Sequence, residues 1–184
     1  FMNAIFQIDA AILLRIQEYL RVGFLTPVIT FITHLGDSGI FWIALTLILL
    51  AFKRTRRIGL TCAVSMIIGL VVTNLILKNW VARIRPYEMI EGLHLLIERQ
   101  KDFSFPSGHA TNSFAAAWVI FCMAPRKYGV PALILACLIA FSRLYVGVHY
   151  PTDVLAGTLI GIAAGSVSQW LLGIAARRWQ RVRE

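Results

Sequence analysis

Long apolar stretches alternate with short polar segments along most of the chain. The stretches cover residues 24–35, 40–52, 58–77, 110–124, 129 to about 148, and 154–176. Several of them approach the ~20 residues that a helix needs to cross the hydrocarbon core of a bilayer. The first stretch contains Pro27 and is shorter than a full span. The pattern predicts an all-α integral membrane bundle of six transmembrane helices, formed as one domain over residues 1–184.

Residues 4–20 repeat with a helical period instead of forming an apolar block. Apolar side chains fall on one face and polar side chains fall elsewhere; the apolar face holds Ile5, Ile8, Ile12, Ile16 and Leu20. This periodicity predicts an N-terminal amphipathic helix. Such a helix either lies at the membrane surface or packs on the bundle, and the pattern does not distinguish the two.

Three glycines, Gly157, Gly161 and Gly165, recur every fourth residue in the last apolar stretch. Small residues at this spacing allow two membrane helices to approach closely. We therefore expect them to mark a helix-packing face and to have no role in chemistry.

Composition agrees with a membrane protein. Hydrophobic residues make up 58% of the 184 residues and the mean hydropathy is +0.72, too apolar for an ordinary soluble domain. The formal charge of +9 would suit a nucleic-acid partner. However, the Lys and Arg residues lie in short clusters between apolar stretches, which favours the membrane and excludes nucleic acid. The sequence leaves the oligomeric state open.

The basic clusters predict an orientation. The loop at 53–57, the turn at 125–127 and the tail at 177–183 hold four, two and four Lys or Arg residues. Six spans place these segments and the N-terminus on one side, which the positive-inside rule makes cytoplasmic. Three polar clusters, at 78–86, 105–109 and 142–153, then share the opposite face. This predicts an active site on the extracytoplasmic face of the plasma membrane.

Cations stand at the ends of the apolar stretches in two of these clusters. Lys78, Arg85 and Arg143 are costly there unless they have a function. An arginine can direct two donors onto phosphate oxygens. The alternative is that such side chains only reach toward lipid headgroups, as isolated cations often do. Arg83 fits that alternative best.

The second cluster, Pro106-Ser107-Gly108-His109, opens an apolar stretch. Ser107 is a helix N-cap signal, and Gly108 permits close approach of a ligand to the backbone. Free N–H groups at a helix start form an anion site, and His109 lies in the first turn beside it. Alone, the motif also fits an ordinary capped helix with a surface histidine.

The third cluster pairs His149 with Asp153 across Pro151, which suits the first turn of a helix. Residues four apart share a helix face, so the carboxylate can fix one imidazole nitrogen and leave the other free to attack. Asp102 is isolated, and no carboxylate cluster suits a two-metal site. We therefore expect chemistry without a metal or cofactor.

Two histidines with three cations indicate phosphoryl transfer. One imidazole would attack phosphorus and the other would protonate the leaving oxygen. The cations and backbone N–H groups would hold the equatorial oxygens, where charge is spread in the transition state.

The three clusters together resemble the signature of the type 2 phosphatidic acid phosphatase family, which is K-x6-R-P, then P-S-G-H, then S-R-x5-H-x3-D. Every signature position matches between 78 and 153. The resemblance implies a six-helix membrane core with His149 as the nucleophile that becomes phosphohistidine. It implies that Asp153 orients His149 and that His109 is first general acid and then base. It assigns phosphate binding to Lys78, Arg85, Ser107, Gly108 and Arg143.

These features predict a membrane lipid phosphatase acting on undecaprenyl pyrophosphate, phosphatidylglycerophosphate or phosphatidic acid, with the first slightly favoured. We expect the lipid to reach the site sideways, near the loop at 87–105. One alternative is a transporter or flippase that binds the headgroup without hydrolysis, although binding would need only the cations. Another is a vanadate-dependent haloperoxidase, which six apolar stretches disfavour.

Overall fold

A computed structural model describes residues 2–181 of the chain, and within this range every regular element is helical. Residues 1 and 182–184, which include the end of the basic tail, lie outside the described residues. The helices are α1 (Met2–Arg15), η1 (Ile16–Leu20), α2 (Leu25–Leu35), η2 (Asp37–Gly39), α3 (Ile40–Ala51), α4 (Arg56–Leu70), η3 (Val71–Leu77), α5 (Lys78–Val81), α6 (Pro86–Met89), α7 (Gly108–Met123), α8 (Arg126–Tyr145) and α9 (Pro151–Arg181). The all-α prediction is confirmed.

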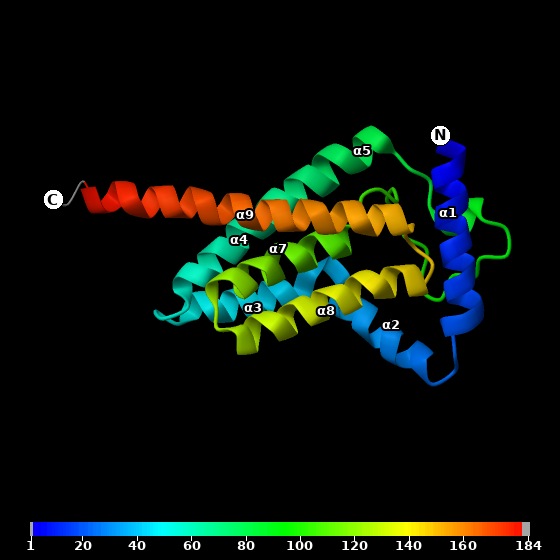
Figure 1. The fold of residues 1–184 in the computed structure, drawn as a ribbon, viewed down its shortest axis with the longest axis horizontal. Coiled ribbons are helices and arrows are strands. Elements are labelled where there is room, and N and C mark those ends of the chain that lie inside the picture. The colour runs from blue at the N-terminus through cyan, green and yellow to red at the C-terminus, as the bar shows by residue number, and fades with distance from the viewer. Residues whose placement is uncertain (1, 182–184) are drawn as a thin grey trace.

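Helix α7 lies in the middle of the bundle, between α4, α8 and α9 (Figure 1). Its buried residues are mostly small, including a run of three alanines at 115–117. Small side chains let neighbouring helices come close where lipid offers no hydrophobic force between them. Trp42 of α3 reaches this core and donates a hydrogen bond to Oγ of Ser113 at 2.9 Å.

The glycine face of α9 packs against α7, as expected. A Cβ on Gly157 would lie 2.5 Å from the carbonyl oxygen of Ser107, and one on Gly161 would lie 2.6 Å from that of Thr111. The backbones of α7 and α9 are therefore in direct contact along this glycine face. This contact bears on function because it fixes the polar N-terminal end of α7, which begins at Ser107.

The number of spans differs from the prediction. Within the described residues, three helices are long and apolar enough to cross a membrane: Arg56–Met89, Arg126–Tyr145 and Pro151–Arg177. The stretches at 24–35 and 40–52 are not two antiparallel spans. They form the pair Leu25–Leu35 and Asp37–Ala51, bent by 49°, which makes a fourth span if it is counted as one. α7, with 16 residues, is shorter than these.

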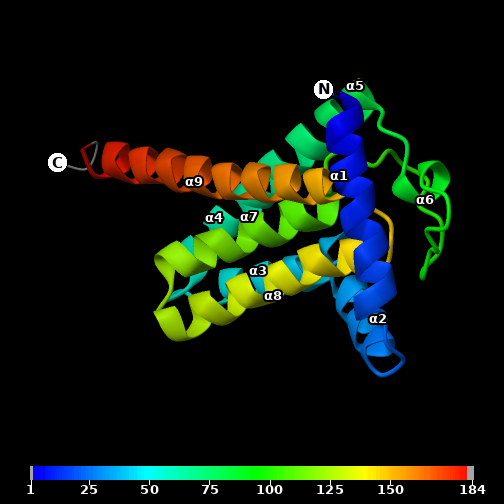
Figure 2. The same ribbon diagram turned by 45° about the vertical axis from the view of Figure 1, so that its right-hand side comes forward.

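This bent pair also corrects the predicted side of the N-terminus. The loop between α3 and α4, the turn between α7 and α8 and the end of α9 lie together at one end of the bundle (Figure 1). α1 crosses the opposite end (Figure 2). There Asp9 accepts a hydrogen bond from the backbone N–H of Thr152 at 3.1 Å. Because α2 and α3 continue in one general direction, the stretches at 24–35 and 40–52 account for at most one crossing, where the sequence predicted two.

The structure shows that the N-terminal helix packs on the bundle, whereas its position at a membrane surface stays a prediction. Leu13 and Ile16 pack on the bundle end, whereas Ile5, Ile8 and Ile12 on the predicted apolar face remain exposed. α1 therefore closes the end of the bundle and also presents an unpaired apolar face, as a helix at a membrane surface would.

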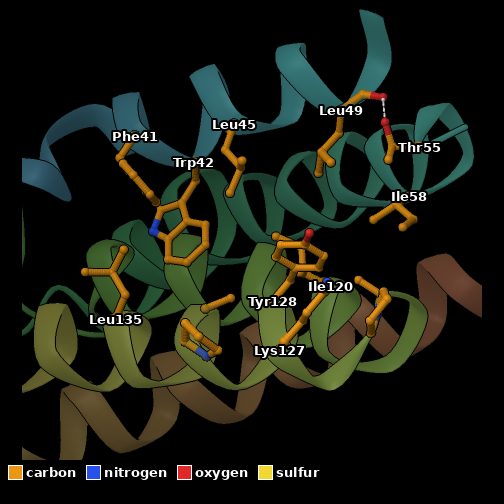
Figure 3. Close-up of a pocket in the computed structure, with 14 residues that line it drawn as sticks. Phe41, Trp42, Leu45, Leu49, Thr55, Ile58, Ile120, Lys127, Tyr128 and Leu135 are labelled. Carbon is orange, nitrogen blue, oxygen red and sulfur yellow. Dashed lines mark hydrogen bonds between the residues drawn. The ribbon is translucent and has the colours of Figure 1, made fainter. Parts of the chain in front are cut away.

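A groove of about 490 Å³ opens at the basic end, between α3, α4, α7 and α8. Figure 3 shows Trp42 and Leu45 on one side of it and Ile120 and Tyr128 on the other. Its lining is almost entirely apolar, and Lys127 is the charged side chain among its lining residues. This groove is larger than the polar cavity described next, but it lacks the groups that phosphoryl transfer requires.

Candidate active site

A polar cavity of about 150 Å³ lies between the break in α2–α3, the start of α7, the end of α8 and the loop at 98–104. Six of the eight predicted site residues line it: Lys78, Arg85, Gly108, His109, Arg143 and His149. Ser107 and Asp153 are fully buried and lie behind this lining. The structure thus brings together three clusters that are separated by up to 75 residues in sequence.

The start of α7 supplies one wall of the cavity. Ser107 is the N-cap, and its Oγ accepts a hydrogen bond from the N–H of Ala110 at 3.4 Å. The N–H of Ser107 donates to the carbonyl oxygen of Asp153 at 3.0 Å, which ties α7 to the first turn of α9. The helix therefore presents its free N–H end to the cavity, an arrangement that favours an anion.

His149 lies in the short loop between α8 and α9 and is 2% exposed. Its Nδ1 is 3.5 Å from Oδ2 of Asp153, a separation longer than a normal hydrogen bond. Its Nε2 is 3.4 Å from Nη1 of Arg85, on the cavity side. Burial lowers the pKa of His149 to about 3, which favours the neutral imidazole.

The carboxylate of Asp153 is held by several donors. The backbone N–H of Tyr150 donates to Oδ2 at 3.0 Å, and the hydroxyl of Ser104 donates to the same oxygen. Arg83 donates to Oδ1 at 2.6 Å. Arg83 was expected only to face lipid headgroups, and that prediction is wrong, because its guanidinium is committed to the support of the His–Asp pair.

Arg143 enters the cavity from the end of α8 and is 1% exposed. Its Nη1 donates to Oγ1 of Thr33 on α2 at 2.7 Å, whereas its Nε is buried without a hydrogen-bond acceptor. An unpaired buried donor is costly in a folded protein. A phosphate oxygen in the cavity would remove that cost.

Lys78 and Arg85 share one partner, Asp102. The ammonium of Lys78 contacts Oδ2 of Asp102 and the guanidinium of Arg85 contacts Oδ1. Arg85 also donates to the carbonyl oxygens of Asp102 and Val148, at 2.9 and 2.8 Å. Partial burial alone would raise the pKa of Asp102, but the two cations outweigh it and lower the pKa below its ordinary value. The carboxylate of Asp102 therefore occupies two of the predicted phosphate-binding residues, Lys78 and Arg85.

Sequence reasoning missed three residues that contact the site. Arg83, Asp102 and Asp37 all touch predicted site residues, and Asp37 lies beside His109. The contacting residues are far apart in sequence: Arg85 and Asp102 are separated by 17 positions, and the other pairs by 24 or more. The sequence offered one signal for Asp37, since Gly36-Asp37-Ser38-Gly39 interrupts an apolar stretch with a charge.

Between residues 2 and 181, no group of three or more His, Cys, Asp or Glu side chains is placed to hold a metal ion. Metal-free chemistry nevertheless remains a prediction, to be tested with a chelator.

A family comparison agrees with this geometry. The model of the PAP2 superfamily matches residues 58–175, which include all eight predicted site residues. The chain belongs to the PAP2 superfamily. The resemblance drawn from the three motifs is therefore confirmed, and the chain is a multi-pass membrane phosphatase of this superfamily.

Curated relatives cover most of the chain. An undecaprenyl-diphosphatase of Sulfolobus acidocaldarius is 36% identical over 149 residues, 81% of this chain and 71% of the relative. Phosphatidylglycerophosphatase B of Bacillus subtilis is 34% identical over 174 residues, 87% of this chain and 81% of the relative.

A solved structure supports the same assignment. The crystal structure of a transmembrane PAP2-type phosphatidylglycerolphosphate phosphatase from Bacillus subtilis superposes with a TM-score of 0.76 at 30% identity. The alignment covers 92% of this chain and 86% of that one. The helices described above are therefore those of the PAP2 transmembrane fold.

Proposed function

We propose that the chain hydrolyses a phosphate monoester or pyrophosphate of a membrane lipid through a phosphohistidine on His149. The observation that carries this proposal is the position of Nε2 of His149. This nitrogen is in the cavity beside Arg85, while Asp153 lies on the other side of the ring. A headgroup-binding transporter would need the cations of the cavity, but not a neutral imidazole supported in this way.

In the first step, Nε2 of His149 attacks phosphorus, and the bond between phosphorus and the leaving oxygen breaks. His109 gives its proton to that oxygen, so the lipid product leaves as an alcohol or as a monophosphate. Lys78, Arg85 and Arg143 and the N–H groups at the start of α7 hold the equatorial oxygens, where negative charge is spread. Asp153 stabilises the positive charge that develops on the His149 ring.

In the second step, water replaces the imidazole. His109, now neutral, takes a proton from the water as its oxygen attacks phosphorus, and the bond between phosphorus and His149 breaks. Inorganic phosphate is released, and His109 is protonated again for the next substrate. The cycle is balanced without an external proton, metal or redox partner.

The lipid chain of the substrate needs an apolar path to the cavity. A groove of about 270 Å³ runs between α3 and α4, and it shares Ser38 and Asn112 with the cavity. Its other lining residues are mostly apolar, including Leu47, Ile67 and Leu70. We propose that the hydrocarbon chain lies in this groove.

The loop at 87–105, which the sequence favoured as the lipid path, offers a different surface. The pocket there is about 200 Å³, shares Arg85 and Asp102 with the cavity, and is lined also by Glu88 and Lys101. A lining with this much charge suits water and phosphate better than a hydrocarbon chain. We therefore assign the passage of water and phosphate to this side.

Undecaprenyl pyrophosphate is the substrate that we favour, with phosphatidylglycerophosphate and phosphatidic acid as the other candidates. The support is the 36% identity to a relative named undecaprenyl-diphosphatase. We also propose that the cavity opens on the extracytoplasmic side, because the basic segments at 53–57 and 125–127 lie at the other end of the bundle. A carrier left as its pyrophosphate in the outer leaflet would reach such a site.

The test is release of phosphate by the purified chain in detergent, measured for each candidate lipid with and without excess EDTA. Release should be fastest with undecaprenyl pyrophosphate, unaffected by EDTA and absent in His149→Ala. Binding of all lipids without release would favour the transporter. Loss of activity in EDTA that Mg²⁺ restores would refute the metal-free mechanism.

A further inference from the structure

The break between α2 and α3 carries an acidic residue that the mechanism above does not use. Oδ1 of Asp37 lies 3.0 Å from Nε2 of His109, although 72 residues separate the two in sequence. Its other oxygen, Oδ2, lies 2.7 Å from Nδ1 of His34, in the last turn of α2. One carboxylate therefore joins an exposed imidazole to the imidazole that faces the cavity.

The backbone at this break is shaped for the contact. Ser38 and Gly39 both have positive φ, 51° and 68°, so the helical path is interrupted directly after Asp37. Gly36 allows His109 to lie against the break, since a Cβ there would be 2.5 Å from Cδ2 of the imidazole. A left-handed residue other than glycine is uncommon and carries strain, which is typical of functional segments.

The electrostatics of the cavity make such a carboxylate useful. Lys78 and Arg143 line the cavity together with His109, and nearby cations disfavour a protonated imidazole. The proposed mechanism nevertheless requires His109 to begin each cycle with a proton. Asp102 is already engaged by Lys78 and Arg85, whereas Asp37 contacts His109 directly.

We propose that Asp37 is a positioning residue for the general acid: it holds Nε2 of His109, favours the protonated ring and leaves Nδ1 for the leaving oxygen. This inference rests on the proposed function, because it assumes that His109 is the general acid. Each histidine of the site then has its own carboxylate. Asp153 lies behind the nucleophile His149, and Asp37 lies behind the acid.

The test compares two leaving groups in the isosteric variant Asp37→Asn. For a lipid alkyl phosphate, kcat/KM, which reports the steps up to departure of the leaving group, should fall about 10- to 100-fold, a part of the ~10²–10⁴ that general acid–base catalysis contributes. For an aryl phosphate such as p-nitrophenyl phosphate, whose leaving group needs no proton, the loss in kcat/KM should be less than about 3-fold. The basic limb of the profile of kcat/KM against pH should move to lower pH. Equal losses for both substrates, or an unmoved limb, would overturn the proposal.

A double-mutant cycle and a matched control complete the experiment. Asp37→Asn in a His109→Ala background should cost no further activity, because the two side chains act as a unit. Glu91→Gln, which removes a charge from an exposed loop position, should leave kcat and the pH profile unchanged. An additional loss in the double variant would show that Asp37 acts independently of His109.

A readout that does not require turnover separates this inference from the proposed function. In protein with ¹⁵N-labelled histidine, the His109 signal is assigned by its absence in His109→Ala. Asp37→Asn should move the titration midpoint of that signal to lower pH. Wild-type protein without phosphatase activity would defeat the proposed function, and an unmoved midpoint would defeat the role of Asp37 whether or not lipid is hydrolysed.

Discussion

Arg83 holds the carboxylate of Asp153, with Nη1 donating to Oδ1 at 2.6 Å. Its Nη2 donates at the same time to Oδ2 of Asp9 on α1, at 2.8 Å. Both carboxylates are almost fully buried, with Asp9 1% exposed and Asp153 fully enclosed. One guanidinium therefore balances two buried anions and connects the N-terminal helix to the residue behind the proposed nucleophile.

Replacing Arg83 by Met should destabilise the protein, because it leaves two buried carboxylates without a counter-charge. The loss should be about 3–5 kcal/mol, as for other buried ion pairs that lose one partner. Thermal unfolding in detergent would measure it. Adding Asp9→Asn to Arg83→Met should recover part of the stability, since one of the two unpaired charges is then gone. If the single variant unfolds at the wild-type temperature, Arg83 is not the support that its contacts indicate.

The separation in sequence explains which parts of the site could be predicted. His149 and Asp153 are one helical turn apart, and Ser107 to His109 are contiguous. The local sequence pattern was therefore sufficient to predict that each of these groups lies together. Arg83 and Asp153 are 70 residues apart, and Asp37 and His109 are 72 apart. Such pairs depend on which helices pack together, which periodicity does not show.

The sequence predicted which segments are helical, but it did not predict the direction of the chain between α2 and α3. Each of the six apolar stretches is helical, and the glycine face of α9 packs on α7 as its spacing indicated. The segment Gly36-Asp37-Ser38-Gly39 has the composition of a full reversal. In the structure it bends the chain by only 49°, and His109 of α7 lies directly against Gly36 at the break. Turn composition therefore suggested the wrong geometry, and the sequence did not show the contact with α7 that accompanies the bend.

Asp102 should compete with substrate for Lys78 and Arg85, whose side chains it contacts. Asp102→Ala should therefore lower the inhibition constant of vanadate, which resembles the trigonal-bipyramidal transition state, and also the KM for lipid phosphate. The effect should be about 2- to 5-fold, because a half-exposed ion pair contributes at most about 1 kcal/mol. Glu98→Gln, an exposed acid in the same loop, is the matched control. Weaker vanadate inhibition in Asp102→Ala would mean that the carboxylate organises the cations and does not block them.

The two histidines should differ in their dependence on the leaving group. His149→Ala should lower turnover at least ~10³-fold for every substrate, because it removes the nucleophile itself. His109→Ala should lower kcat/KM by ~10²–10⁴ for alkyl phosphates and much less for aryl phosphates, because this constant reports the step in which the leaving oxygen is protonated. A plot of log kcat/KM against leaving-group pKa for each variant measures the difference. Identical slopes would show that the roles are wrongly assigned.

The last prediction concerns the sides of the membrane. The structure places α1 and the loop at 87–105 at the end of the cavity, and the basic loop at 53–57 at the other end. After replacement of Cys62, Cys122 and Cys137, single cysteines at Gln7, Arg54 and Glu91, all exposed, provide three probes. A membrane-impermeant thiol reagent on intact cells should label position 91 and, given one crossing for the bent α2–α3 pair, position 7. The reagent should label position 54 only after the cells are permeabilised. Labelling of 54 without 91 would place the site on the cytoplasmic side, and labelling of 91 without 7 would restore an additional crossing near the N-terminus.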